Sequence, residues 1–464
     1  MEYIENRTFD EIELGDTASL IRTLSQEDIE LFAVMSGDVN PAHLDLEYAR
    51  SDMFHKIIAH GMWGGSLIST LLGTKLPGPG TIYLGQTLKF KRPVALGDTI
   101  TVTITAVVKD VQRNGITFDC TCVNQKGEVV ISGSADVIAP TERVKRPRVI
   151  LPEVFLYEHG ARYRNLIEAA AKLDPVTVAV VNPLEPAFLA SIVEATQKNI
   201  IKPIIIGPVT KIREAAEFAS IDITQFNIRE AEYGLMSAIE AVRLARTGEV
   251  EALVKGNLPY EDMMKAVNAP DTGLATYYRM SHVFIMDVPT YPRPLFLTDA
   301  VLNIYPDLDT KRDIVQNAID LAHVVGLENP KVAILSAVTT VNAQIKSTLD
   351  AAALCKMVDR GQITGGIVDG PLSFDTAISL QAARERGIVS PVAGLADVLV
   401  VPDLESGNIL ARQLEYLAEA QGVGVVLGAR VPIMLAIHAD SSITHLASYA
   451  LASLLAHKRR TTTP

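Results

Sequence analysis

The chain has 464 residues, with 42 Lys and Arg against 54 Asp and Glu, so its formal charge is −12 at pH 7. Hydrophobic residues make up 48% and charged residues 21%, a composition that is typical of soluble globular domains and excludes disordered and fibrous classes. The length predicts roughly two to four domains at ~150 residues each. The acidic balance argues against nucleic acid as a partner, because phosphate backbones are bound by an excess of Lys and Arg.

Targeting and redox features predict a cytoplasmic protein without a membrane partner. The N-terminus lacks a basic stretch followed by an apolar core, and no run of about 18 apolar residues could span a bilayer. The three cysteines, Cys120, Cys122 and Cys355, are odd in number and have no His or Cys cluster near them. We therefore expect reduced thiols and no metal site.

The first predicted elements form an α+β domain. The strongly apolar stretch 60–76 is its helix candidate. Strands with period-two alternation follow at 100–105, 116–121 and 129–138, separated by turns that contain Gly or Asn. We expect residues 1–140 to form an antiparallel sheet with one solvated face, wrapped around one long helix.

The stretch 141–150 is predicted to be a basic linker. It contains a proline and shows no hydrophobic periodicity. Its charged side chains are interpreted as a solvated tether, and contact with an anionic cofactor is the alternative. These side chains are Arg143, Lys145, Arg146 and Arg148.

From residue 151 to residue 464, short apolar runs alternate with amphipathic stretches. This rhythm is typical of βαβ units and predicts an α/β domain whose mostly parallel sheet has helices on both faces. The stretch exceeds the usual size of one domain, so we expect two lobes with a cleft. The predicted strands are 176–181, 204–206, 252–254, 283–286, 332–335, 398–401, 425–427 and 433–436, and the helices include 186–198, 235–246, 310–325 and 405–421.

A first group of residues suited to chemistry lies near Asp38 and His43. Asn40-Pro41 between them interrupts a helix and starts a turn, so both side chains could converge on one point. The N–H of Gly61, at the start of the apolar helix, could hold negative charge that develops on a carbonyl oxygen. An acid–base pair beside such a donor suits the addition of water next to a thioester. Taken alone, Asp38 and His43 would more simply be a helix cap and a surface residue.

Three motifs occur in order in this region: Ser-Gly-Asp-Val-Asn-Pro-Ala-His-Leu-Asp at 36–45, Ala-His-Gly-Met at 59–62 and Tyr-Leu-Gly-Gln-Thr-Leu-Lys-Phe-Lys-Arg-Pro-Val at 83–94. Together they resemble the MaoC-type (R)-specific enoyl-CoA hydratases, which have the hot-dog fold. The resemblance covers most of residues 1–140. It implies that trans-2-enoyl-CoA is hydrated to (R)-3-hydroxyacyl-CoA, and that the chain is a homo-oligomer, at least a dimer formed through the hot-dog domain.

The same resemblance implies roles for four residues. Asp38 and His43 would activate the water and shuttle its proton, and the Gly61 N–H would hold the thioester oxygen. Ser69 stands where such hydratases often carry a supporting Ser, although it could equally be a helix-face hydroxyl bonded to its own backbone. His60 is expected to fix the start of the helix.

Three basic residues lie at the end of the third motif's strand: Lys89, Lys91 and Arg92. They could meet the phosphates of coenzyme A through charge-assisted contacts. A solvated strand face is the alternative.

The second part of the chain resembles the phosphate acetyl/butyryltransferase family, which moves an acyl group between coenzyme A and phosphate. The resemblance spans nearly all of residues 150–464 and rests on Val-Ala-Val-Val-Asn-Pro at 178–183, Pro-Ile-Ile-Ile-Gly-Pro at 203–208, Val-Lys-Gly at 254–256, Arg-Met-Ser-His-Val-Phe-Ile-Met at 279–286, Thr-Gly-Gly-Ile-Val-Asp-Gly-Pro at 364–371 and Gly-Ala-Arg-Val-Pro-Ile-Met-Leu at 428–435 with Ala-Asp-Ser at 439–441. A hot-dog domain fused ahead of such a transferase is the architecture of a bifunctional enoyl-CoA hydratase/phosphate acetyltransferase. Coenzyme A thioesters, with inorganic phosphate, would be the substrates, and no bound cofactor is expected.

The presumed phosphate site departs from the family pattern. Family members usually carry Arg near the position of Ala275 and a Ser-Arg pair where this chain has Ile437-His438. Two Arg side chains suited to bidentate phosphate binding are therefore missing, and we expect a weakened or lost transferase. The remaining candidates for substrate binding are Lys255, Arg279, Arg430, His438, Asp440 and Ser441.

Three hypotheses follow. The first is an enzyme with both activities. The second is an active hydratase whose C-terminal domain is a non-catalytic binding or oligomerisation module. The third, a metal-dependent decarboxylating dehydrogenase of similar fold, is disfavoured because the sequence shows no clear acidic metal cluster.

Overall fold

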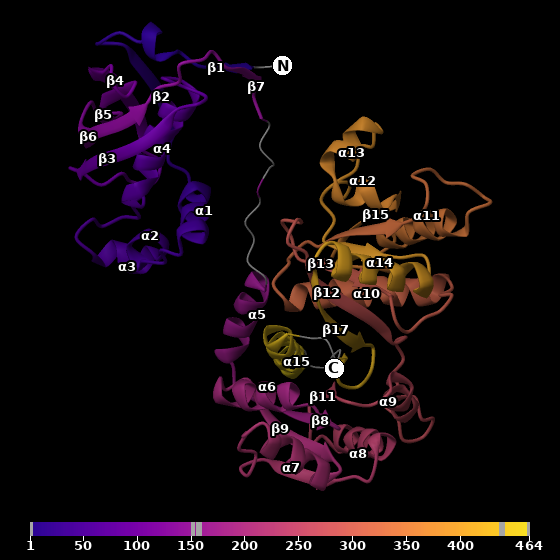
Figure 1. The fold of residues 1–464 in the computed structure, drawn as a ribbon. Coiled ribbons are helices and arrows are strands. Elements are labelled where there is room, and N and C mark those ends of the chain that lie inside the picture. Colours follow the sequence, from indigo (N-terminus) through magenta and orange to yellow (C-terminus); the bar gives the residue numbers. More distant parts are fainter. Residues whose placement is uncertain (1–2, 150–153, 155–159, 436–440, 462–464) are drawn as a thin grey trace. The chain divides into compact units, whose positions relative to one another are not determined.

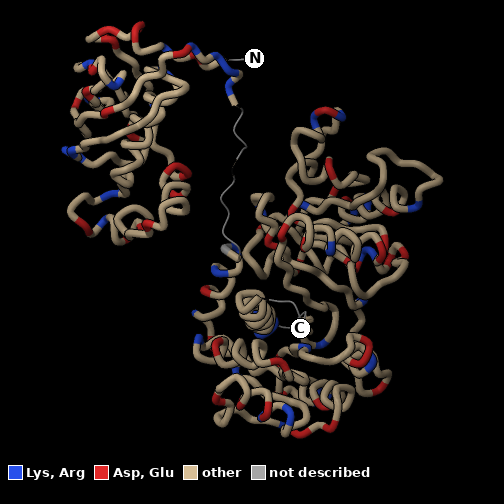
Figure 2. Tube along the Cα trace, in the orientation of Figure 1, with Lys and Arg blue, Asp and Glu red and all other residues tan. Residues whose placement is uncertain are grey.

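The computed structural model describes residues 3–149, 154, 160–435 and 441–461. The chain divides into two compact units, Met1–Leu156 and Tyr157–Pro464. Lys and Arg are interspersed with Asp and Glu along both units, so neither trace shows a continuous basic stripe (Figure 2).

The first unit is the predicted α+β domain, in which one long helix packs against an antiparallel sheet. The sheet has the strand order β2-β4-β5-β6-β3, and α4 packs against β2 and β4 (Figure 1). The elements are β1 Tyr3–Glu5, a 3-10 turn at Phe9–Glu11, β2 Thr17–Thr23, α1 Gln26–Ser36, α2 Pro41–Leu44, α3 Leu46–Ser51, α4 Gly61–Thr74, β3 Ile82–Phe90, β4 Thr99–Asp110, β5 Gly115–Asn124, β6 Val129–Ile138 and β7 Lys145–Pro147.

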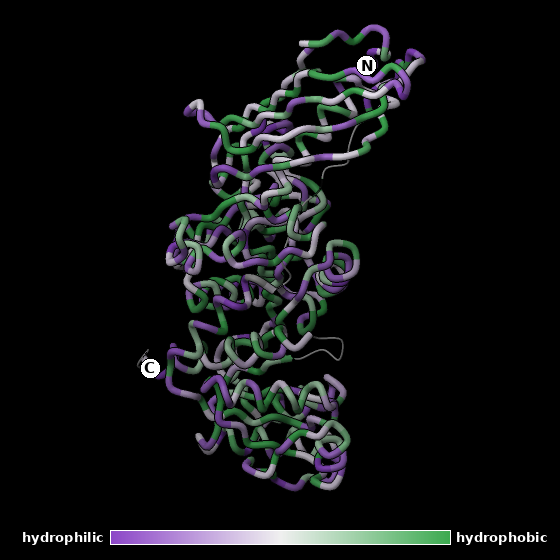
Figure 3. The backbone as a smooth tube through the Cα atoms, turned by 60° about the vertical axis from the view of Figure 1, so that its left-hand side comes forward, coloured by the Kyte–Doolittle hydropathy of each residue, from purple (hydrophilic) through white to green (hydrophobic). Residues whose placement is uncertain are grey.

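The alternation predicted for this sheet is present. Along most of β4, buried and half-buried residues follow each other, and hydrophobic and hydrophilic residues mix along the strands (Figure 3). Cys120 and Cys122 lie on the buried face of β5 as free thiols, and burial raises the pKa of each to about 12. Because of these raised pKa values, neither thiol is ionised near neutral pH.

Part of the predicted linker 141–150 is a strand of the first unit. β7 pairs with β1 in antiparallel fashion, Tyr3 opposite Pro147 and Glu5 opposite Lys145. The guanidinium of Arg143 forms ion pairs with Glu5 and Glu11. Arg143 therefore pairs with acidic residues near the start of the unit's sequence, so the segment is not simply a solvated tether.

The second unit contains one eleven-stranded sheet in the described residues, in the order β10-β9-β8-β11-β18-β17-β12-β13-β16-β14-β15. The strands are β8 Val176–Val181, β9 Ile201–Gly207, β10 Asn227–Glu230, β11 Ala252–Lys255, β12 Ser281–Asp287, β13 Leu295–Thr298, β14 Lys331–Leu335, β15 Ile367–Leu372, β16 Val398–Val400, β17 Gln421–Leu427 and β18 Ile433–Leu435. The helices are α5 Ala161–Ala171, α6 Pro186–Gln197, α7 Val209–Phe218, α8 Gly234–Thr247, α9 Tyr260–Val267, α10 Leu308–Val324, α11 Lys346–Asp359, α12 Phe374–Ile378, α13 Leu380–Glu385, α14 Leu404–Leu417 and α15 Ser442–Thr461.

The two predicted lobes are two blocks of this one sheet. Strands β10, β9, β8, β11 and β18 run parallel to one another, as do β13, β16, β14 and β15. Between the blocks, β17 and β12 are antiparallel to their neighbours. The second block therefore runs opposite to the first, and the carboxyl ends of the two blocks lie at opposite edges of the sheet.

One hydrophobic core crosses both blocks. It includes Val178 of β8 and Val332 of β14, each fully buried. No helix in the described part of the chain is long and apolar enough to cross a membrane.

Candidate active site

A tight turn places Asp38 and His43 at one end of the first unit's long helix. Gly37 ends α1 in a left-handed conformation, with φ of 75°, which a glycine adopts without strain. The Asn40 side chain then caps α2 by accepting from the Ala42 N–H at 3.1 Å. The helix thus ends at Gly37, before the predicted interruption, and Asn40-Pro41 begins α2 rather than a turn. The two side chains still lie close together.

His60 completes a cluster with these two residues. The ligand-capable side-chain atoms of Asp38, His43 and His60 all lie within 4.8 Å of one another. The ring centroids of His43 and His60 are 4.0 Å apart. Asp38 is exposed, His43 is half-buried and His60 is buried, so the cluster runs from solvent into the protein.

The two histidines are held by backbone carbonyls, which fixes their tautomers. His43 Nδ1 lies 2.9 Å from the carbonyl oxygen of Ile58, and His60 Nε2 lies 3.0 Å from that of Asp38. Because a carbonyl oxygen only accepts, each of these nitrogens carries the proton. In the neutral rings, His43 Nε2 and His60 Nδ1 then keep their lone pairs, and His60 Nδ1 is buried without a partner among the described residues.

His60 stands at the N-cap position of α4, the start of the helix that it is expected to fix. His60 immediately precedes α4, but its side chain makes no capping hydrogen bond there. It orients the Asp38 backbone instead. The N–H of Gly61, in the first turn of α4, therefore lacks both an intrahelical partner and a side-chain cap.

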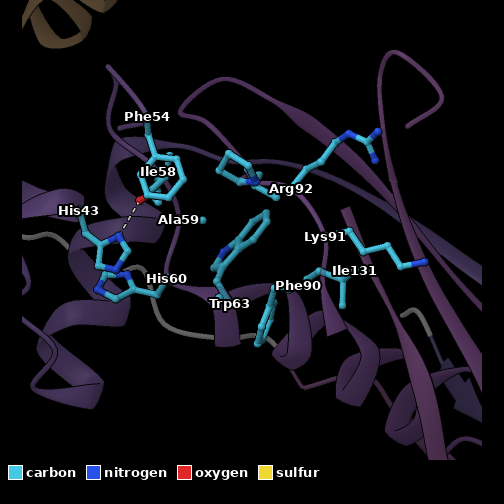
Figure 4. Close-up of a pocket in the computed structure, with 14 residues that line it drawn as sticks. His43, Phe54, Ile58, Ala59, His60, Trp63, Phe90, Lys91, Arg92 and Ile131 are labelled. Carbon is cyan, nitrogen blue, oxygen red and sulfur yellow. Dashed lines mark hydrogen bonds between the residues drawn. The ribbon is translucent and has the colours of Figure 1, made fainter. Parts of the chain in front are cut away.

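A pocket of about 320 Å³ lies beside the cluster (Figure 4). A Cβ at Gly61 would lie 3.1 Å from the Phe90 ring, and a Cβ at Gly64 would lie 2.3 Å from Ile131 Cδ1. The two glycines thus allow close packing of the start of α4 against the sheet. The lining residues are His43, Phe54, Ile58, Ala59, His60, Gly61, Trp63, Gly64, Phe90, Lys91, Arg92, Pro93, Val94 and Ile131.

Ser69 is not brought to this pocket. It lies in α4, two turns beyond Gly61, is exposed, and is not among the lining residues. Its supporting role remains a prediction.

The carboxylate and imidazole groups of Asp38, His43 and His60 are also common ligands of transition metals, so this cluster is where a metal could be held.

The candidates in the second unit fall at two separate edges of its sheet. Lys255 ends β11 beside Leu435 of β18, at the edge we call the Lys255 edge. Its side chain is buried, and Nζ donates to the Gly256 carbonyl at 3.1 Å. Ser441 directly precedes α15, and its hydroxyl oxygen lies 2.7 Å from that of Thr444. His438 and Asp440 lie outside the described residues.

Arg279 and Arg430 lie at the opposite edge, which we call the Arg279 edge. Arg279 precedes β12 and Arg430 follows β17, at the ends where Ser281 pairs with Leu427. The segment that contains Ala275 lies there too, since Arg430 N–H donates to the Leu274 carbonyl at 2.9 Å. Both Arg side chains are exposed. Lys255 and the two arginines thus stand at opposite ends of their strands, and their part in phosphate binding remains a prediction.

Comparison with known proteins agrees with both units. The family model "Phosphate acetyl/butaryl transferase" matches residues 230–453, and the model "MaoC like domain" matches residues 13–125. A phosphate acetyltransferase of Rhizobium meliloti is 51% identical over 300 residues, which cover 65% of this chain and 95% of that protein. The chain belongs to the phosphate acetyl/butyryltransferase family. Ahead of its transferase domain it carries a MaoC-like hot-dog domain.

Solved structures resemble each part of this phosphate acetyl/butyryltransferase family member. A branched-chain phosphotransacylase from Enterococcus faecalis has 27% identity and a TM-score of 0.54, and the match covers 61% of this chain and 99% of that one. An R-hydratase from Pseudomonas aeruginosa has 41% identity and a TM-score of 0.33, and the match covers 33% of this chain and 99% of that one.

The expected weakening of the transferase is not supported by the comparisons. It required Ala275 and Ile437-His438 to depart from the family at one shared phosphate site. Ile437 and His438 lie outside the described residues. The transferase domain is 51% identical to a phosphate acetyltransferase, and the match covers 95% of that protein. This similarity argues against a loss of activity.

Proposed function

We propose that the first unit hydrates trans-2-enoyl-CoA to (R)-3-hydroxyacyl-CoA. The observation that carries this proposal is the convergence of the Asp38 carboxylate, the lone pair of His43 Nε2 and the uncapped Gly61 N–H beside one pocket. These are a group that positions water, a base and a donor for a developing oxyanion, in that order.

The reaction needs only protons and water. Asp38 and His43 hold the water, and His43 Nε2 removes one of its protons as the oxygen attacks C3. The double-bond electrons shift so that negative charge gathers on the thioester oxygen, where the Gly61 N–H stabilises it. Return of the proton to C2 completes the addition, with one C–O bond and one C–H bond formed per water consumed.

The second unit, in this proposal, transfers an acyl group between coenzyme A and inorganic phosphate. A phosphate oxygen attacks the thioester carbonyl, the C–S bond breaks, and acyl phosphate and coenzyme A are released. A thioester is already activated, so positioning and oxyanion stabilisation can supply the catalysis. This reaction is placed at the Lys255 edge, because ligands of open α/β sheets bind beyond the carboxyl ends of the strands.

One set of assays on the full chain tests both halves. Wild type is expected to hydrate crotonyl-CoA, and Asp38→Asn to lower kcat at least about 100-fold because the carboxylate is lost. Acyl-phosphate formation from acetyl-CoA or butyryl-CoA and phosphate should be equal in the two proteins. The matched control is Asp45→Asn, which removes a carboxylate that caps α3 outside the cluster.

Each assay has a contradicting result. Undiminished hydration by Asp38→Asn would reject the assignment of Asp38. Loss of hydration in EDTA, restored by a divalent metal, would point to a metal held by the same cluster. Absence of acyl phosphate would favour the alternative, in which the second unit is a non-catalytic binding or oligomerisation module.

A further inference from the structure

We infer that Lys91, at the mouth of the hydratase pocket, recognises the phosphates of coenzyme A, with Arg92 as a weaker contributor. This inference rests on the proposed hydratase function. Of the three basic residues near the end of β3, Lys91 and Arg92 line the pocket and Lys89 does not. The inference therefore concerns Lys91 and Arg92 only.

The backbone fixes these two cations relative to the reacting groups. The N–H groups of Lys91 and Arg92 both donate to the Val130 carbonyl, at 2.8 and 3.3 Å. Three residues on, the Val94 carbonyl accepts from the Ala59 N–H at 2.8 Å. Ala59 adjoins Ile58, whose carbonyl holds His43, so short hydrogen-bonded links join the cationic segment to the acid–base cluster.

The side chains divide the pocket into two ends. In Figure 4, His43 and His60 lie on one side of Trp63 and Phe90, and the Lys91 and Arg92 side chains extend on the other. A thioester held at Gly61 would pass its pantetheine arm along these aromatic rings. Its phosphates would then meet the basic end.

The two cations differ in how much charge they can offer. Arg92 Nε lies 3.5 Å from Glu128, and its Nη1 donates to the Val129 carbonyl at 3.1 Å. The Lys91 side chain makes no hydrogen bond or ion pair with the residues that the structure describes. In a chain of net charge −12, Lys91 is therefore the uncompensated cation of this pocket.

Two substrates of the hydratase separate phosphate recognition from chemistry. Crotonyl-CoA carries the phosphates, whereas crotonyl-N-acetylcysteamine ends after the first amide of the pantetheine arm. In Lys91→Ala we expect KM for crotonyl-CoA to rise about fivefold, equivalent to ~1 kcal/mol. The kcat for both substrates and KM for the truncated thioester should not change, and Lys91→Arg should restore the KM.

Lys89→Ala is the matched control, an exposed lysine of β3 outside the pocket, and it should leave both KM values unchanged. Added salt should raise the wild-type KM for crotonyl-CoA more than that of Lys91→Ala, because salt screens an exposed charge. An unchanged KM for crotonyl-CoA in Lys91→Ala, or an equal rise for both thioesters, would overturn the inference. A wild type that hydrates neither thioester would overturn the proposed hydratase function, and this inference with it.

Discussion

Glu11 is a single residue that ties the end of the first unit to its beginning. Its carboxylate accepts from the Thr8 N–H at 3.0 Å and forms an ion pair with Arg143. The hydrogen bond from the Thr8 backbone, followed by that from Arg143, lowers the pKa of Glu11 to about 2. The charged form is therefore the one that holds the segment 143–147 against β1.

This shift predicts a pH dependence at the residue scale. Because the pKa is lowered on folding, the contribution of Glu11 to stability is complete above the ordinary pKa of about 4.5 and is lost as pH falls towards about 2. Glu11→Gln should therefore speed hydrogen exchange of the β7 amides at pH 7. Its denaturation midpoint should lie below that of wild type at pH 7 and coincide with it near pH 2. Glu142→Gln, an exposed neighbour, is the control, and equal midpoints of Glu11→Gln and wild type at pH 7 would contradict the prediction.

At the scale of elements, the contact between β6 and β3 depends on the absence of a side chain at Gly133. Gly133 pairs with Leu88, and a Cβ there would lie 1.8 Å from the Thr87 carbonyl oxygen. The two strands would have to separate to admit it. Because β3 leads directly into Lys91 and Arg92, this contact also sets where the pocket's basic end lies.

Gly133→Ala is therefore expected to destabilise the first unit by ~1–3 kcal/mol, the usual cost of forcing extra atoms into a packed site. Gly73→Ala is the matched control: this exposed glycine of α4 has nothing within 4 Å of its ideal Cβ. It should stabilise the unit by ~0.5–1 kcal/mol, because Ala favours helix more than Gly does. Chemical denaturation measures both changes, and a neutral Gly133→Ala would show that the strands can shift freely.

At the scale of the whole molecule, the two edges of the first unit's sheet differ in how they are protected. On the β2 edge, Lys75 Nζ donates to the Ser19 carbonyl at 2.7 Å, and Arg22 forms an ion pair with Asp28 at 2.6 Å. The β3 edge is longer and exposes large apolar side chains, Ile82, Tyr83, Leu84 and Phe90. Charged groups discourage strand pairing, whereas an apolar edge invites it.

We accordingly propose that the chain forms at least a dimer through β3. Leu84→Lys should lower the mass of the assembly in sedimentation velocity, because the added charge would be buried between paired edges. Ile21→Lys places the same charge on the β2 edge, where Ile21 is 70% exposed, and should leave the mass unchanged. An unchanged mass in Leu84→Lys would contradict pairing through β3.

Much of the fold could be predicted from local patterns. The strands 100–105, 116–121 and 129–138 were predictable because a half-buried strand alternates between water and core. Strand β3 was expected from its motif, but its position at the edge of the sheet was not, because its residues are exposed or half-buried on both faces and its sequence shows no alternation. Its exposure reflects an unpaired edge, which no local pattern reports.

The sites were predictable to different degrees. Asp38 and His43 lie five residues apart, so the break in the helix signalled by Asn40-Pro41 sufficed to bring them together. The contact of His60 with the Asp38 turn was missed, because the hydrogen bond from His60 to the Asp38 carbonyl spans 22 residues. The position of Lys255 and Arg279 at opposite ends of the strands was not predictable, because a buried strand such as β12 has the same apolar composition whether it runs with or against its neighbours.

The sequence by itself determined the two domain types and the break in the chain that presents Asp38 and His43. These features depend on backbone preferences and side-chain periodicity over a few residues. Only the tertiary structure decided the reversal of strand direction in the second sheet, the return of Arg143 to Glu11, and the choice of Lys91 over Lys89 at the pocket. Each of these depends on which distant segments pair, and pairing is set by packing across the whole domain rather than by neighbours in the chain.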